Sequence, residues 1–171
     1  MFQLSRTARL LIASQASGTK VHASGRPFTD ASGDRLRGWL GIGRKIFYDE
    51  SRVAIVPMGL CFPGQDARGS DLAPRREGAP LWRTKLMQHL GAVELVLAIG
   101  MYAQNWHLAG FRKPSLTETV KAWHEPYEML RPPVIPLPHP SWRNNGWIRR
   151  NPWFEAELLA VVRSDVRRLV G

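Results

Sequence analysis

Four short apolar runs stand out along the chain, at residues 9–14, 53–57, 94–99 and 134–137. Each run is almost continuously apolar rather than alternating, which is typical of parallel strands covered on both faces. The stretches between the runs carry apolar residues at helical spacing. Because such stretches alternate with the runs, the pattern predicts an α/β fold. We expect a three-layer α/β/α domain around a central four-stranded, mostly parallel sheet.

The helical stretches are expected at residues 32–40, 77–90, 101–108, 117–123 and 152–170. The first is predicted to start from a cap on Ser32. The last has the clearest pattern, because Pro152 occupies its first turn and its aliphatic residues fall on one side. The chain has 171 residues, enough to bury a core of its own, so we predict a single domain over residues 1–171.

Charge and cysteine content narrow the choice of partner and compartment. Lys and Arg number 24 against 14 Asp and Glu, a formal net charge of +10 at pH 7. Such an excess is typical of nucleic-acid-binding proteins, and the alternative is a solvated surface with no such partner. No apolar run is long enough to cross a membrane, so we expect no membrane partner. The single cysteine, Cys61, excludes an intramolecular disulfide and suits the cytoplasm, where we expect association with the bacterial nucleoid.

Candidate chemistry gathers where the apolar runs end. The run 134–137 leads into Pro138-His139-Pro140, which holds one imidazole between two prolines at the C-terminal edge of a strand. In open parallel sheets, ligands bind at that edge. The loops after three of the strands are therefore expected to converge on one cleft, with an acid, imidazoles and flat apolar rings. These residues are Asp30, His22, His139, Phe28 and Phe62.

Five short motifs follow one another along residues 9–145. They are Ser14-Gln15-Ala16-Ser17-Gly18, Gly25-Arg26-Pro27-Phe28 followed by Ser32-Gly33, Cys61-Phe62-Pro63, Ile99-Gly100-Met101-Tyr102-Ala103 and His139-Pro140-Ser141. In this order they resemble the uracil-DNA glycosylase superfamily, most closely its family-4 and family-5 branches. The resemblance implies a DNA-repair enzyme that extrudes uracil from DNA and hydrolyses its N-glycosidic bond, with DNA as partner and free uracil as product.

The resemblance also implies roles for single residues. Phe28 matches the position that stacks the extruded base, and His139 matches the donor that stabilises the departing uracil anion. Backbone groups of Ala16 and Ser17 are expected to contact the base or a neighbouring phosphate. The asparagine that reads the base edge in the family is absent, and Pro57-Met58 stands there. We therefore expect Met58, Gly59 or the Gln15 amide to read the base, and another deaminated or mismatched base is an alternative substrate.

The carboxylate of the site departs from the family-4 pattern. That branch has an acid in the first turn, where this chain has Gln15, which orients water but cannot act as a base. Family 5 instead places an aspartate shortly before Ser-Gly, and Asp30 stands there with a spacing one residue shorter. We predict that Asp30 activates water or stabilises the sugar cation. The alternative is an aspartate at a turn or helix start beside Ser32.

The resemblance bears on cofactors as well. Family-4 members hold a 4Fe–4S cluster on four cysteines, and Cys61 matches only one of them. One thiolate cannot hold such a cluster, so we predict no metal and no cofactor. The segment that surrounds the cluster in the family is then expected to be held by packing of Leu81 and Trp82.

DNA contacts are predicted around and beyond His139. The family places there a loop that enters the minor groove, and Trp142 with Arg143 fits a wedge with phosphate contacts. Trp147 and Trp153 are assigned to the core instead. The long connection 61–76 carries three arginines and is a candidate phosphate-contacting loop. Further DNA contacts are expected from Ser141, Asn144, His22 and Arg68.

Two other hypotheses remain open at this stage. The absence of the first-turn acid and of the recognition asparagine also fits a non-catalytic or product-trapping binder of uracil-containing or damaged DNA. A small-molecule α/β enzyme, similar to a nucleoside hydrolase, is disfavoured by the positive charge. We expect a monomer.

Overall fold

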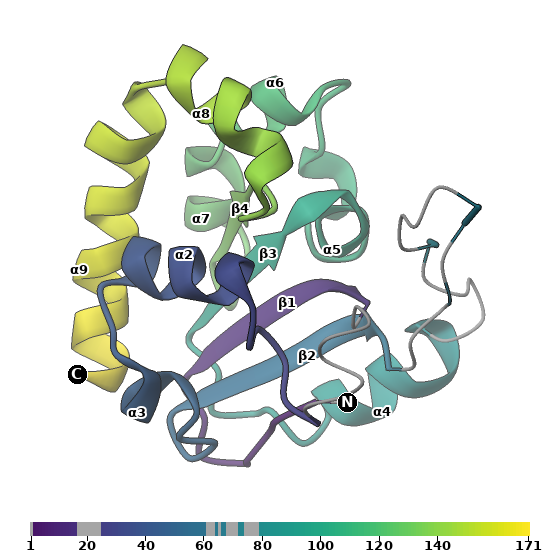
Figure 1. Ribbon diagram of the computed structural model, residues 1–171. Coiled ribbons are helices and arrows are strands. Elements are labelled where there is room, and N and C mark those ends of the chain that lie inside the picture. Colours follow the sequence, from purple (N-terminus) through teal and green to yellow (C-terminus); the bar gives the residue numbers. More distant parts are fainter. Residues whose placement is uncertain (1, 17–24, 61–63, 65, 68–71, 74–78) are drawn as a thin grey trace.

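The computed structural model describes residues 2–16, 25–60, 64, 66–67, 72–73 and 79–171 (Figure 1). Its centre is a four-stranded sheet in the order β2-β1-β3-β4. The strands are β1 (Leu10–Ala16), β2 (Val53–Gly59), β3 (Leu95–Ile99) and β4 (Val134–Leu137). Every strand pair is parallel, as the continuous apolar runs predict. All four strands therefore end at the same edge of the sheet.

The register places prolines only where a strand tolerates them. Pro57 pairs with Ser14, and Pro136 pairs with Ala98. Both prolines belong to edge strands, β2 and β4, where a missing backbone donor costs least. On its outer side β2 meets the N-terminal segment in one antiparallel bridge, between Gln3 and Ile55.

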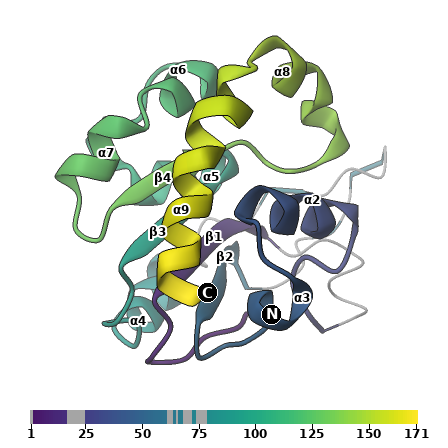
Figure 2. The ribbon, with the colours of Figure 1, turned by 90° about the vertical axis from the view of Figure 1, so that its left-hand side faces the viewer.

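Helices cover both faces of the sheet, which confirms the three-layer prediction. One face packs against α2 (Ala31–Leu40), α3 (Arg44–Phe47) and α9 (Leu159–Val170), as Figure 2 shows. The other packs against α4 (Thr84–Met87) and α5 (Gly100–His107). The remaining helical elements are η1 (Ala79–Arg83), η2 (Ala109–Phe111), α6 (Leu116–Lys121), α7 (His124–Met129), η3 (Trp142–Asn144), α8 (Asn145–Arg150) and η4 (Phe154–Leu158).

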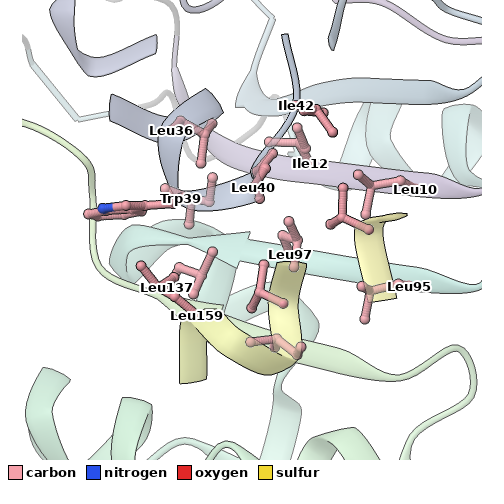
Figure 3. Close-up of a cluster of buried hydrophobic side chains, with 14 of the residues drawn as sticks. Leu10, Ile12, Leu36, Trp39, Leu40, Ile42, Leu95, Leu97, Leu137 and Leu159 are labelled. Atoms are coloured by element: carbon pink, nitrogen blue, oxygen red, sulfur yellow. The ribbon is translucent and has the colours of Figure 1, made fainter. Parts of the chain in front are cut away.

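Successive residues of each strand serve opposite cores. Leu10 and Ile12 of β1 point into the larger cluster together with Trp39 and Leu159, which Figure 3 draws from the side of the helices. Leu11 and Ala13 belong to the second cluster under α4 and α5. Each fully buried aliphatic side chain contributes about 1.5–3 kcal/mol, so both faces hold the sheet in place.

The element boundaries correct several sequence predictions. The strands β1 and β2 run two residues further than expected, to Ala16 and Gly59. The helix α2 is capped by Asp30 rather than Ser32. A capping box of Ser115 and Glu118 starts α6. The helices α3, α7 and α8 were not predicted, and the first turn of the C-terminal helix is a π-helical segment, η4.

Candidate active site

The C-terminal edge of the sheet brings the predicted strand ends together. Register pairs Ala16 of β1 with Gly59 of β2, and Ile99 of β3 with Leu137 of β4. His139 follows two residues after Leu137, and Gly100 directly follows Ile99. The neighbouring strand ends therefore form one edge, which is where ligands bind in parallel α/β sheets.

The backbone on both sides of His139 is fixed by side chains. The buried Gln104 amide of α5 donates to the Leu137 carbonyl at 2.9 Å, just before the imidazole. The Asn144 amide donates to the carbonyl of His139 itself at 2.7 Å. The residue as a whole is half-buried at this edge. Gln104 was missed by the sequence analysis, since nothing in a helical pattern shows that an amide reaches the next strand.

Gly100 lies next to His139 at the start of α5. Its φ is +75°, in the left-handed region that favours glycine. A Cβ built on it would lie 3.7 Å from the Cβ of His139 and 3.9 Å from its Cδ2. The strand end β3 thus approaches the imidazole closely, and the glycine of the Ile99-Gly100 motif has a conformational reason.

Phe28 is held in a backbone conformation that bulky residues rarely adopt. Its φ is +57°. Its carbonyl accepts hydrogen bonds from Arg37 Nη1 at 3.1 Å and from Tyr48 Oη at 2.9 Å. A Cβ on Gly33 would lie only 1.8 Å from the same carbonyl oxygen. Strained residues that their surroundings hold in this way cluster at functional sites.

The ring of Phe28 is only 8% exposed and belongs to the larger core cluster. It meets the ring of Phe47 edge-on, with centroids 6.2 Å apart. Phe28 is therefore a core residue as well as the predicted stacking residue, and an extruded base would meet a limited part of the ring.

Asp30 caps α2, which is the alternative role considered for it. Its Oδ1 accepts a hydrogen bond from the backbone N–H of Gly33 at 3.2 Å. The residue is half-buried, and within the described part of the chain its Oδ2 has no hydrogen-bond partner. The capping geometry therefore leaves one carboxylate oxygen for further contacts.

The ends of β1 and β2 hold the residues predicted to read the base. Gln15 is half-buried and lies in β1 rather than in a turn, as does Ala16. Met58 is 6% exposed and Gly59 is buried, so their contribution to a ligand would come largely from the backbone. Several predicted residues lie outside the described residues, namely Ser17, His22, Cys61, Phe62 and Arg68.

A buried cation anchors η1 to the end of β2. Arg83 is 2% exposed, and its Nη1 donates to the carbonyls of Val56 at 2.8 Å and Pro57 at 3.2 Å. Its Nε donates to Nε2 of His107 on α5 at 3.2 Å. The predicted anchors, Leu81 and Trp82, are instead 59% and 53% exposed. The prediction for these two side chains is wrong, because hydrogen bonds of Arg83 hold the segment.

Burial governs the protonation of this pair. It lowers the pKa of the Arg83 guanidinium to about 10. Burial, and then the charge of Arg83, lower the pKa of His107 to about 3. The imidazole is therefore neutral and offers Nε2 as an acceptor. Residues 83 and 107 share no local pattern in the sequence, so this pair could not be predicted from it.

The segment after His139 is helical, which corrects the prediction of a loop. Trp142 opens η3 and is 75% exposed, as a wedge requires. The Ser141 carbonyl accepts a hydrogen bond from Arg35 Nη1 of α2 at 3.1 Å. Arg143 is exposed, whereas the Asn144 amide is used within the protein.

The assignment of Trp147 and Trp153 to the core is confirmed. Both are partly buried against the larger cluster, and their rings meet Phe154 edge-on at 5.4 and 6.4 Å between centroids. The Trp147 indole also donates to Thr117 Oγ1 at 2.9 Å. This packing fixes α8, and with it the base of the exposed Trp142.

In the part of the chain that the structure describes, no three His, Cys, Asp or Glu side chains are grouped closely enough to hold a metal ion. Nor does any described helix have the length and apolar character needed to cross a membrane.

One known family has a sequence model that matches nearly the whole chain. The model of the uracil DNA glycosylase superfamily matches residues 2–163, a range that includes all five motifs and every strand. The chain belongs to the uracil DNA glycosylase superfamily.

Proposed function

We propose that this protein is a monofunctional uracil-DNA glycosylase of base-excision repair, related to the family-4 and family-5 branches. Membership of the superfamily supports an N-glycosyl hydrolase that acts on DNA. The observation that carries the proposal is the backbone at His139, which the Gln104 and Asn144 amides hold at the sheet edge. An iron–sulfur cluster is not part of it, since one cysteine cannot supply four thiolates.

The proposed reaction breaks the bond between C1′ of the sugar and N1 of uracil. The electron pair of that bond leaves with the base, so negative charge builds on uracil while the sugar becomes an oxocarbenium-like cation. His139 donates a hydrogen bond to the departing base. A preorganised donor of this kind contributes about 3–4 kcal/mol to lowering the barrier. The rigid backbone around His139 supports this role, because such a donor must not need to move.

Asp30 acts on the sugar side of the bond. Its Oδ1 is used by the cap of α2, and its Oδ2 orients the attacking water or stabilises the cation. The water oxygen adds to C1′, and the proton it loses passes to the carboxylate or to solvent. Gln15 orients the same water from the end of β1, while Phe28 stacks the base from its constrained backbone.

Release of free uracil from a uracil-containing duplex oligonucleotide tests the proposal. We expect His139→Ala to slow release by about 100-fold or more. Asp30→Asn keeps a side-chain oxygen for the cap, since Asn caps helices as well as Asp, so its expected loss of activity reports on the carboxylate. Arg167→Gln on the exposed end of α9 is the matched control. Parent rates in both site variants would refute the assignment.

A second candidate is a binder of uracil-containing or damaged DNA that does not turn over. It is favoured by the absence of an acid in the first turn, where Gln15 stands. A stable complex with no base released over long incubation would support it. Parallel substrates with hypoxanthine, xanthine or mismatched thymine distinguish a binder from a glycosylase with another base specificity.

A further inference from the structure

A groove lies beside the candidate active site, between α2 and α8. Its volume is about 380 Å³, toward the lower end of the range of about 300–1,000 Å³ typical of ligand sites. Its lining comes from α2, α8 and η4. The lining residues are Arg35, Trp39, Asn145, Ile148, Arg149 and Glu155. Figure 1 shows α8 above α2, with α9 along the left side of the molecule.

The groove has a rigid apolar floor and a cationic rim. Trp39 is 5% exposed and meets Phe154 edge-on with centroids 5.0 Å apart, so the larger core cluster holds the floor in place. Asn145 and Arg149 stand one helical turn apart on the exposed side of α8. Among the described residues, Arg149 takes part in no ion pair, and neither does Glu155. The lining therefore carries two guanidinium groups against one carboxylate, an excess of one positive charge.

The groove is continuous with the segment predicted to contact DNA. Arg35 lines it, and the same guanidinium donates to the Ser141 carbonyl at 3.1 Å. Ser141 stands two residues after His139 and directly before the exposed Trp142. A strand whose nucleotide is extruded at His139 must continue past this segment on one side or the other. On the side of α2 and α8 it meets the groove.

We propose that this groove binds the phosphodiester backbone of the DNA strand next to the extruded nucleotide. Arginine suits this ligand, because its planar guanidinium contacts two phosphate oxygens at once. The apolar floor packs against the face of a deoxyribose. This inference rests on the proposed function, and it assigns to that function a second anchoring point beyond the His139 segment.

Glu155 makes the direction of the change in DNA affinity testable. A carboxylate in the groove repels a phosphate, so its removal should strengthen DNA binding, whereas removal of Arg149 should weaken it. A groove that binds no DNA predicts effects no larger than those of a charge change on a distant surface. Both residues are exposed, so neither substitution removes a core contact.

The experiment measures affinity for a duplex carrying one 2′-fluoro-deoxyuridine, whose fluorine disfavours the sugar cation and slows cleavage. Fluorescence anisotropy gives the dissociation constant over a range of salt concentrations. We expect Arg149→Gln to weaken binding about ten-fold and to reduce the slope of log K against log salt by about 1. Glu155→Gln should tighten binding about three-fold, since it removes the charge that repels the phosphate. Arg167→Gln, with the same loss of charge on distant α9, should change it less than about two-fold.

The proposal is overturned if Arg149→Gln weakens DNA binding no more than Arg167→Gln, or if Glu155→Gln fails to strengthen DNA binding. In either case the proposal is overturned even if the groove binds another anionic ligand, such as an acidic peptide. Uracil release by the parent protein separates this result from the proposed function. If the parent protein releases uracil and the groove variants bind DNA like the control variant, only the proposal for the groove is refuted. No release, with opposite effects of the two variants, removes the glycosylase proposal and leaves a DNA-binding groove.

Discussion

The neutral imidazole of His107 should make the protein lose stability in mild acid. In the unfolded chain the histidine has its ordinary pKa of 6.5, while in the folded protein burial and the Arg83 charge lower the pKa to about 3. Below pH 6.5 the unfolded chain therefore binds a proton that the folded protein does not. The stabilisation is present in full above pH 6.5 and is lost progressively as the pH falls toward 3.

The loss of stability at pH 5 depends almost entirely on the ordinary pKa of histidine in the unfolded chain. The folded protein keeps His107 unprotonated over this range. Protonation of His107 therefore stabilises the unfolded chain by about 2 kcal/mol between pH 7.5 and pH 5, and the free energy of unfolding falls by that amount. A folded pKa one unit higher would leave that figure nearly unchanged, because pH 5 would still lie above it. The loss is large against the typical stability of about 5–15 kcal/mol.

Urea unfolding at the two pH values tests this, with His107→Gln as the key variant. Gln keeps an oxygen that accepts from Arg83 but does not titrate. The parent should lose about 2 kcal/mol more than the variant on going from pH 7.5 to pH 5. His89→Gln, at an exposed position, should keep the pH dependence of the parent. Equal losses in the parent and in His107→Gln would refute a buried neutral imidazole.

Three further substitutions test the site. Gly33→Ala would place a Cβ 1.8 Å from the Phe28 carbonyl oxygen, so we expect a loss of more than about 2 kcal/mol, measured by thermal unfolding. Gln104→Leu leaves the Leu137 carbonyl without its donor and should cost about 1–3 kcal/mol. If Gln104 also positions His139, kcat for uracil release should fall while KM changes little, and an unchanged kcat would show a purely structural role. Trp142→Ala should leave stability within about 0.5 kcal/mol, because the side chain is 75% exposed. It should slow release from duplex more than from single-stranded DNA, and equal slowing would contradict a wedge.

The layers of the fold were predictable because their cause is local. A strand covered on both faces is apolar along its buried length. The strands β2, β3 and β4 show this directly in the sequence, and β1 shows it as far as Ala13. The alternation of these runs with helical stretches then fixes the three layers. The strand ends met at one edge as expected, since parallel strands share a direction.

The elements that were missed depend on tertiary contacts. The sequence Asn144-Asn145-Gly146 is typical of a turn, yet α8 forms there because Trp147 packs against Phe154. Arg83 has the appearance of a surface residue in a helical stretch, and only the fold brings it under the carbonyls of Val56 and Pro57. Asp30 illustrates a different limit, because a residue that caps a helix is not thereby excluded from chemistry.

The outer edge of β2 has a consequence for how copies of this protein meet. Val53 donates its N–H to the Asp49 carbonyl at 2.9 Å, and Ile55 donates to Gln3 at 2.7 Å. The next outward position is Pro57, which has no N–H at all. From Val53 to Pro57, this described edge therefore offers no free donor to an incoming strand. Two molecules cannot extend their sheets through it, so the fold carries its own protection against edge-to-edge aggregation on that side.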